Sequence, residues 1–230
     1  MKNKNIILAI SVICVGLLLA GGTYAYLSFA FNATNSTYNE KVECFDIVYD
    51  AGGNITGTLF PTAKSSDGMS GGVAMNVAST CNVSGKGTLT LTVDNATNNT
   101  LLQAVTGHCE NKNTLESMTE YVQTNSDKYE TRLYQTSASC TSAGGTWVTT
   151  GSALKYAVYT NSAGTGNPVA KGYITSGFKG TSTPIYTNFD VNSTQLNLYV
   201  FVWMDGWLID NTYNSLPFSG NIHTTITQTE

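Results

Sequence analysis

The sequence contains very little positive charge and almost no histidine. In 230 residues there is one arginine, Arg132, and there are two histidines, His108 and His223. Charged residues make up only 11% of the chain, and the formal net charge is −4. A protein that binds nucleic acid needs clustered Lys and Arg to neutralise phosphates, so we exclude that class and expect no nucleic-acid partner.

Catalytic motifs are missing as well. The sequence has no H-E-x-x-H zinc-protease motif, no Walker loop and no dinucleotide-binding glycine motif. A G-x-S-x-G match at residues 68–72 precedes a predicted strand, whereas the nucleophile of that motif needs a strand-to-helix turn. We therefore expect a protein that is not an enzyme and that has no catalytic residues, no cofactor and no metal site.

The abundant residues are those of a β-rich extracellular domain. Hydrophobic residues make up 41% of the chain, which is enough for an ordinary globular core. The chain also has 22 glycines and 13 tyrosines, and Thr, Ser and Asn supply most of its polar residues.

The N-terminus has the form of an export signal. Lys2 and Lys4 precede an apolar run over residues 6–20, and the next charge is Glu40. A basic start, an apolar run and a small residue predict cleavage between Ala25 and Tyr26. The alternative is a retained membrane anchor, because the apolar stretch continued through Phe31 exceeds the roughly 20 residues that span a bilayer.

Four cysteines lie outside this leader: Cys44, Cys81, Cys109 and Cys140. An even number of cysteines in an exported chain indicates disulfides, and four cysteines allow three pairings. We favour Cys44–Cys81 and Cys109–Cys140, because each pair then brackets one segment of the sequence. A zinc site does not fit, since the chain has no C-x-x-C spacing.

The rest of the chain reads as short strands separated by polar turns. Residues 88–93 alternate strictly between Thr and apolar side chains, and residues 195–204 are apolar on both faces, as in a central buried strand. The strands are predicted at residues 41–49, 55–60, 73–80, 88–93, 153–160, 169–175, 185–190, 195–204 and 222–228. This pattern predicts an all-β fold, a jelly-roll-like β-sandwich.

Residues 107–150 differ from the strands around them. Residues 113–116 have the form of a helix capping box, and Leu115, Met118 and Val122 then share one helical face. We interpret the segment as a small helical insertion between two strands, closed by the Cys109–Cys140 disulfide. It is either a stabilised decorative loop or a recognition surface, and we expect the domain to fold without it.

Several segments together resemble the TasA/camelysin family of Gram-positive surface and biofilm-matrix fibre proteins. Residues 21–28, GGTYAYLS, resemble the cleavage junction of substrates of the signal peptidase SipW. Residues 199–206 and 218–223 resemble the C-terminal strands of the family, and residues 59–61 and 73–76 resemble its early loop and strand. The 107–150 segment and the four cysteines depart from the family pattern.

The resemblance implies three parts: residues 1–25 as signal peptide or membrane anchor, residues 26–43 as an N-terminal segment, and residues 44–230 as the sandwich. It also implies cleavage by a signal peptidase, a location outside the cell or on the surface of a Gram-positive-type bacterium, and homopolymerisation into fibres. In such fibres the freed N-terminal strand of one subunit completes the sheet of the next. Tyr26, Leu27, Phe29 and Phe31 are the candidate donor-strand residues, because residues 26–31 are short, uncharged and β-prone.

Two alternatives remain open at the level of the sequence. Residues 26–31 are instead the end of an uncleaved anchor helix if the leader is retained. The chain is then a membrane-anchored binding module for a glycan or a host surface, with Trp147 and the 107–150 insertion as its binding face.

Overall fold

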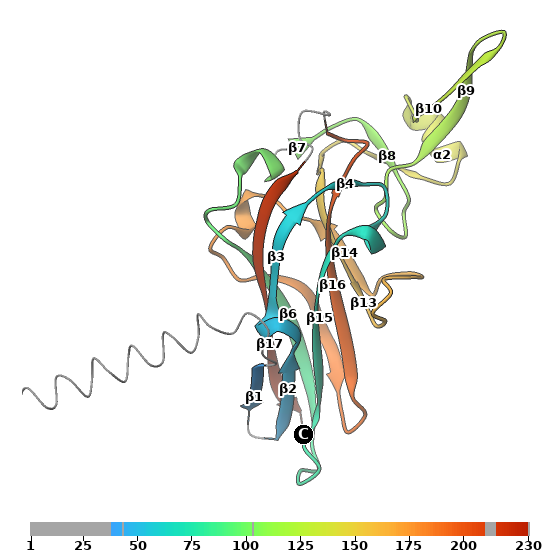
Figure 1. The fold of residues 1–230 in the computed structure, drawn as a ribbon. Coiled ribbons are helices and arrows are strands. Elements are labelled where there is room, and N and C mark those ends of the chain that lie inside the picture. The colour runs from blue at the N-terminus through green and yellow to red at the C-terminus, as the bar shows by residue number, and fades with distance from the viewer. Residues whose placement is uncertain (1–37, 43, 103, 210–214, 230) are drawn as a thin grey trace, which may run out of the picture.

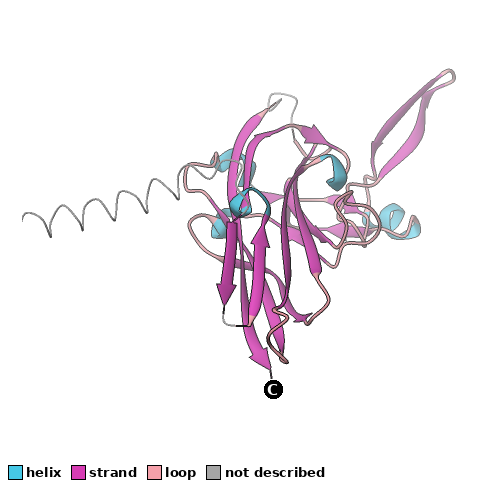
Figure 2. Cartoon of the chain, turned by 60° about the horizontal axis from the view of Figure 1, so that its bottom comes forward, coloured by secondary structure: helices cyan, strands magenta, loops and turns pink. Residues whose placement is uncertain are grey.

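A computed structural model of the chain describes residues 38–42, 44–102, 104–209 and 215–229. Two antiparallel sheets face each other in this part of the chain, and a thin hairpin projects from one end of them (Figure 1). The helices are short and lie at the margins of the strands (Figure 2).

The larger sheet has a long apolar strand near its middle. Its order is β1 (Tyr38–Val42), β2 (Phe45–Tyr49), β5 (Met69–Val77), β16 (Leu196–Asp205), β13 (Leu154–Tyr159) and β14 (Ala170–Tyr173). The two-residue strand β4 (Pro61–Thr62) pairs in parallel with the end of β16. The order of the second sheet is β15 (Thr183–Val191), β6 (Ser84–Val93), β17 (Leu216–Thr229) and β3 (Asn54–Leu59).

Each predicted strand overlaps a strand of these two sheets, which confirms an all-β sandwich. The main core lies between the sheets and includes Ile47, Met75, Leu89, Leu91 and Phe218, all of which are buried. Leu89 and Leu91 point inward from β6, as the alternation of residues 88–93 predicts.

Strand β16 is buried on both faces, as its sequence predicts. It lies between β5 and β13, and its Leu198, Val200 and Val202 side chains belong to the core between the sheets. Phe201 and Trp203 point to the opposite face, where they form a second apolar cluster with Ala157 and Tyr159 of β13. Leu115 packs against this second cluster, so part of the 107–150 segment covers the outer face of the larger sheet.

Both predicted disulfides are present. Cys44 bonds to Cys81, and Cys109 bonds to Cys140. The first joins the turn before β2 to the turn after β5, two neighbouring strands of the larger sheet. The second ties β8 (His108–Glu110) to helix α2 (Ser137–Ser142), within the insertion.

The helix predicted from residue 113 to residue 122 is wrong. Leu115 adopts a positive φ of 62°, which ends any helix at that residue, and residues from Thr119 onward form a β-hairpin instead. The Glu116 carboxylate does not cap a helix; it accepts hydrogen bonds from Ser65 and Thr114. The one α-helix among the described residues of the insertion is α2, which begins after Thr136 as its N-cap.

The insertion is therefore mostly strand. Its elements are β8 (His108–Glu110) paired with β11 (Thr146–Val148), β9 (Thr119–Asn125) paired with β10 (Lys128–Leu133), and α2. Next to it, β7 (Ala104–Val105) pairs with β12 (Gly151–Ser152). Four 3₁₀ turns are described: Asp50–Gly53, Ser65–Asp67, Asn99–Leu102 and Ser176–Phe178.

The leader and the candidate donor strand lie outside the described residues. This holds for the cleavage residues Ala25 and Tyr26 and for Leu27, Phe29 and Phe31. The larger sheet already begins at Tyr38, six residues before the predicted start of the sandwich at Cys44. Within the described ranges, no helix is long and apolar enough to cross a membrane.

Candidate functional site

A lysine is buried on the outer face of the larger sheet, between two buried carboxylates. Lys155 is the second residue of β13 and has no exposed surface. Its Nζ atom is 2.7 Å from Glu110 Oε1 and 2.8 Å from Asp205 Oδ2, and it also donates to the carbonyl oxygen of Leu115 at 2.7 Å. Glu110 comes from the insertion and Asp205 from the end of β16, so the cluster joins three separate parts of the chain.

Asp205 is held by hydrogen bonds to both of its carboxylate oxygens. Oδ2 accepts from the backbone N–H of Ser117 at 3.2 Å and from the Ser117 hydroxyl at 2.8 Å. Oδ1 accepts from the backbone N–H of Trp207 at 3.1 Å. The Asp205 side chain is completely buried.

Glu110 is held by three side chains. Besides Lys155, its carboxylate contacts His108 Nε2 at 2.7 Å and accepts a hydrogen bond from the Tyr173 hydroxyl. Burial on its own raises the pKa of Glu110. The hydrogen bonds from His108, Lys155 and Tyr173 and the charge of Lys155 together lower this pKa by more than burial raises it, so the net shift is downward. Burial, and then the hydrogen bond to Glu110, raises the pKa of the Tyr173 phenol.

These contacts attach the insertion to the sheet. Glu110 and Ser117 supply side-chain partners for Lys155 and Asp205, and Glu116 bonds to Ser65, whose hydroxyl lies 2.8 Å from that of Tyr159. A buried charge left without its partner is costly, so the contacts argue against the expectation that the domain folds equally well without the insertion.

The lowered pKa of Glu110 predicts a loss of stability in acid. Because the folded pKa lies below the ordinary value of 4.5, ionised Glu110 stabilises the fold above that value. This contribution disappears as the pH falls through the folded pKa. We expect the free energy of unfolding in urea to drop between about pH 6 and pH 3, and to drop less in Glu110→Gln. Glu130→Gln, on the exposed hairpin, is the control and should follow the wild-type dependence. If the free energy of unfolding falls equally with pH in wild type and in Glu110→Gln, Glu110 does not have a lowered pKa in the folded protein.

A second feature is the free edge of strand β3, the side of β3 with which no described strand pairs. The outer strands of the two sheets are β1, β14, β15 and β3. The sequences of the first three contain charged residues, and β15 also has Pro184 and two irregularities in its register. Charges, proline and bulges are devices that discourage the addition of another strand. Strand β3, with the sequence NITGTL, has none of them.

The pairing of β3 shows which backbone groups face outward. Thr58 lies opposite Pro217, which has no N–H, so this is a pair without mutual hydrogen bonds. Ser219, opposite Thr56, turns its carbonyl away from β3 to accept from the N–H of Asp94. The alternation of an antiparallel ladder then directs the N–H and C=O groups of Thr56 and Thr58 to the free edge.

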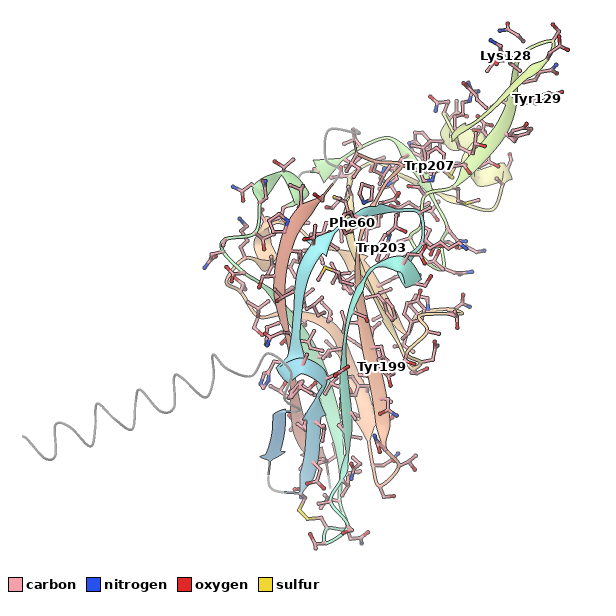
Figure 3. The ribbon with its side chains drawn as sticks, in the orientation of Figure 1. Phe60, Lys128, Tyr129, Tyr199, Trp203 and Trp207 are labelled. Carbon is pink, nitrogen blue, oxygen red and sulfur yellow. A yellow bond between two sulfur atoms is a disulfide. The ribbon has the colours of Figure 1, made fainter. Side chains whose placement is uncertain are left out.

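The free edge also has a gap in its inward-facing side chains. Ile55 and Leu59 are buried, whereas Gly57 between them is exposed. A Cβ atom at Gly57 would lie 3.0 Å from Cε of Met69, so the methionine forms the floor of the gap. Phe60, which follows β3, is 62% exposed and projects near its end (Figure 3).

A third feature is the pair of tyrosines on the β9–β10 hairpin. Tyr121 and Tyr129 are 71% and 53% exposed, and their rings stack with centroids 5.1 Å apart and planes 10° apart. Tyr129 and Lys128 lie on the projecting part of the hairpin, away from the sandwich (Figure 3). Trp147, which the sequence suggested as part of a binding face, is half-buried in β11 beside the Cys109–Cys140 disulfide.

Comparison of the chain with protein-family models, with curated proteins and with solved structures finds no match. The site is therefore interpreted from its own geometry. Among the described residues, no three His, Cys, Asp or Glu side chains are grouped so that they could hold a metal ion.

Proposed function

We propose that the chain is an exported structural subunit of the cell surface or extracellular matrix, with a jelly-roll-type sandwich that polymerises by strand donation. In this proposal, residues 26–31 of one copy add to the free edge of β3 in the next copy. The observation that carries the proposal is the edge itself: among the outer strands of the two main sheets, β1, β14, β15 and β3, only β3 lacks charge, proline and bulge.

Main-chain hydrogen bonds from Thr56 and Thr58 provide the affinity of such a contact, and side chains of the donor provide its register. Phe29 and Phe31 alternate with Ser28 and Ala30 in the sequence, so one face of an extended donor is aromatic. The gap at Gly57, with Met69 below it and Phe60 beside it, offers an apolar surface for one of these rings. Methionine–aromatic contacts are favourable and tolerate imperfect fit.

Two further features agree with this role. The two disulfides fit an oxidising compartment outside the cytoplasm. Donation from the N-terminus of one subunit to a different surface of the next is a head-to-tail contact that does not close, and such contacts generate filaments. Cleavage by a signal peptidase after Ala25 frees the donor; a retained leader instead leaves a membrane-anchored subunit.

The edge of β3 is tested by two substitutions at one position. Thr58→Pro removes the N–H that faces the free edge, while its pairing with Pro217 has no hydrogen bond to lose. Thr58→Val keeps the N–H and is the matched control. We expect the exported Thr58→Pro chain to be a folded monomer by sedimentation and the Thr58→Val chain to form fibres. Fibres of wild-type yield from folded Thr58→Pro would rule out β3 as the acceptor.

The tyrosine pair on the hairpin favours a second candidate function, a binding module for a glycan or a host surface. Exposed, stacked aromatic rings on a projecting hairpin offer a flat apolar surface to a sugar ring or a partner protein. We expect Tyr121→Ser/Tyr129→Ser to abolish binding to a polysaccharide array without changing the melting temperature. Glu130→Ser, at the neighbouring position on the other face of the hairpin, should bind as wild type does. Unchanged binding by the tyrosine variant would exclude this surface.

A further inference from the structure

The buried Lys155 cluster has the composition of a reaction site. A primary amine, Lys155 Nζ, is in contact with the carboxyl group of Asp205 at 2.8 Å, and a second carboxyl group, Glu110, lies 2.7 Å from the same nitrogen. The Lys155, Asp205 and Glu110 side chains are each at most 1% exposed. As ions they place two negative charges against one positive charge in the protein interior.

Apolar side chains border the cluster. Trp203 lies opposite Lys155 in the strand register, and Ala157 and Leu115 belong to the apolar cluster on the same face. The Trp203 indole nitrogen, although fully buried, has no hydrogen-bond partner among the described residues. Burial of this kind excludes bulk water from the amine and the carboxyl group.

Asp205 is also positioned as an acceptor of nucleophilic attack. The N–H of Trp207 points to Oδ1, and the N–H and hydroxyl of Ser117 point to Oδ2. Fixed donors on a carboxyl group stabilise the negative charge that develops on oxygen when an amine adds to its carbon. The paired strands β13 and β16 hold the two groups in contact. Intramolecular reactions between groups oriented in this way reach effective molarities of about 10⁵–10⁸ M.

We propose that Lys155 and Asp205 join in an intramolecular amide bond, with Glu110 as the proton-transfer residue. The reaction needs no oxidant or cofactor: an ammonium and a carboxylate become one amide and one water. Lys155 first passes a proton to Asp205, which gives a neutral amine and a carboxylic acid. The amine nitrogen attacks Cγ of Asp205, Glu110 takes a proton from that nitrogen and returns it to the departing hydroxyl group, and water leaves as the C–O bond breaks.

The product removes two of the three buried charges of the cluster. Bond formation removes the ammonium and one carboxylate together and leaves Glu110 with its contacts to His108 and Tyr173. The amide links β13 to β16 covalently and closes the chain between residues 155 and 205. This inference does not depend on polymerisation, because all the groups come from one chain.

Mass spectrometry of the wild-type protein tests the bond directly. The full chain is expressed, its disulfides are reduced, its N-terminus is determined, and its mass is compared with the sum of its residues. We expect a deficit of about 18 Da, the mass of one water. After proteolysis, the peptides that contain Lys155 and Asp205 should appear as one branched peptide. A reduced chain with its full residue mass, and separate Lys155 and Asp205 peptides, would overturn the proposal.

Three variants assign the roles. Lys155→Arg should have the full mass, because a guanidinium forms no such bond, whereas Lys171→Arg on β14 should keep the deficit. Asp205→Asn should lose about 17 Da instead, since ammonia leaves in place of water. Glu110→Gln should form the bond about 10²–10⁴-fold more slowly, as expected when a proton-transfer group is removed. A water deficit that persists in Lys155→Arg would place the modification elsewhere and contradict the assignment.

Discussion

An exported chain in which Phe29 and Phe31 are both replaced by aspartate is expected to remain a folded monomer and to form no fibres. Both residues fall on one face of the proposed donor strand, so each subunit junction would place two charges on the inward face of the donor, one of them against the apolar gap beside Gly57. An unpaired buried charge costs several kcal/mol, roughly 3–5 when it is left in an interior. Sedimentation and negative-stain imaging of the exported variant measure the outcome.

The matched control carries the same charges on the other face of the donor. Ser28→Asp/Ala30→Asp changes the two alternate positions, whose side chains face away from the acceptor in an extended strand. We expect this control to polymerise. Fibres of wild-type yield from the Phe29/Phe31 variant would show that residues 26–31 are not the donor, whatever the fate of the control.

Asp205→Ala is expected to destabilise the folded domain by at least about 3–5 kcal/mol. This is the range measured when one partner of a buried ion pair is removed, and loss of the proposed Lys155–Asp205 amide adds to it. The substitution deprives Lys155 of one of its two carboxylates and leaves the Ser117 hydroxyl and N–H without an acceptor. Urea unfolding followed by circular dichroism gives the free energy of unfolding and its dependence on denaturant.

A surface ion pair of similar length is the control for this prediction. Lys86 and Asp190 lie 2.6 Å apart, but their side chains are 41% and 75% exposed. Solvent screens such a pair, so Asp190→Ala should cost less than about 1 kcal/mol. If the two aspartate variants lose the same small amount, the buried cluster does not hold the insertion on the sheet.

The parts of the fold that follow from local patterns are predictable from the sequence. Strand β6 follows from the alternation of threonine with leucine and valine, and the central position of β16 follows from its two apolar faces. The disulfide pairing was also predictable, because each bond closes the sequence segment between neighbouring cysteines.

The insertion was mispredicted because a capping-box pattern is local and the competing contacts are not. Glu116 bonds to Ser65, 51 residues away in sequence, and the positive φ of Leu115 allows its carbonyl to reach Lys155. The buried cluster could not be predicted from local patterns either, because Glu110, Lys155 and Asp205 come from three segments that are far apart in the sequence. One local signal was present. Lys155 is the one charged residue in the strand LKYAVY, whose other residues are apolar or tyrosine, and a lysine within such a strand indicates a buried charge that needs a partner.

The most direct test of the proposed role is an electron cryomicroscopy reconstruction of the material that cells export. The account predicts filaments in which each subunit begins at Tyr26 and residues 26–31 lie hydrogen-bonded along β3 of the neighbouring subunit, with an aromatic ring over Gly57. Dispersed monomers that retain Met1, or filaments in which the edge of β3 is bare, would contradict it.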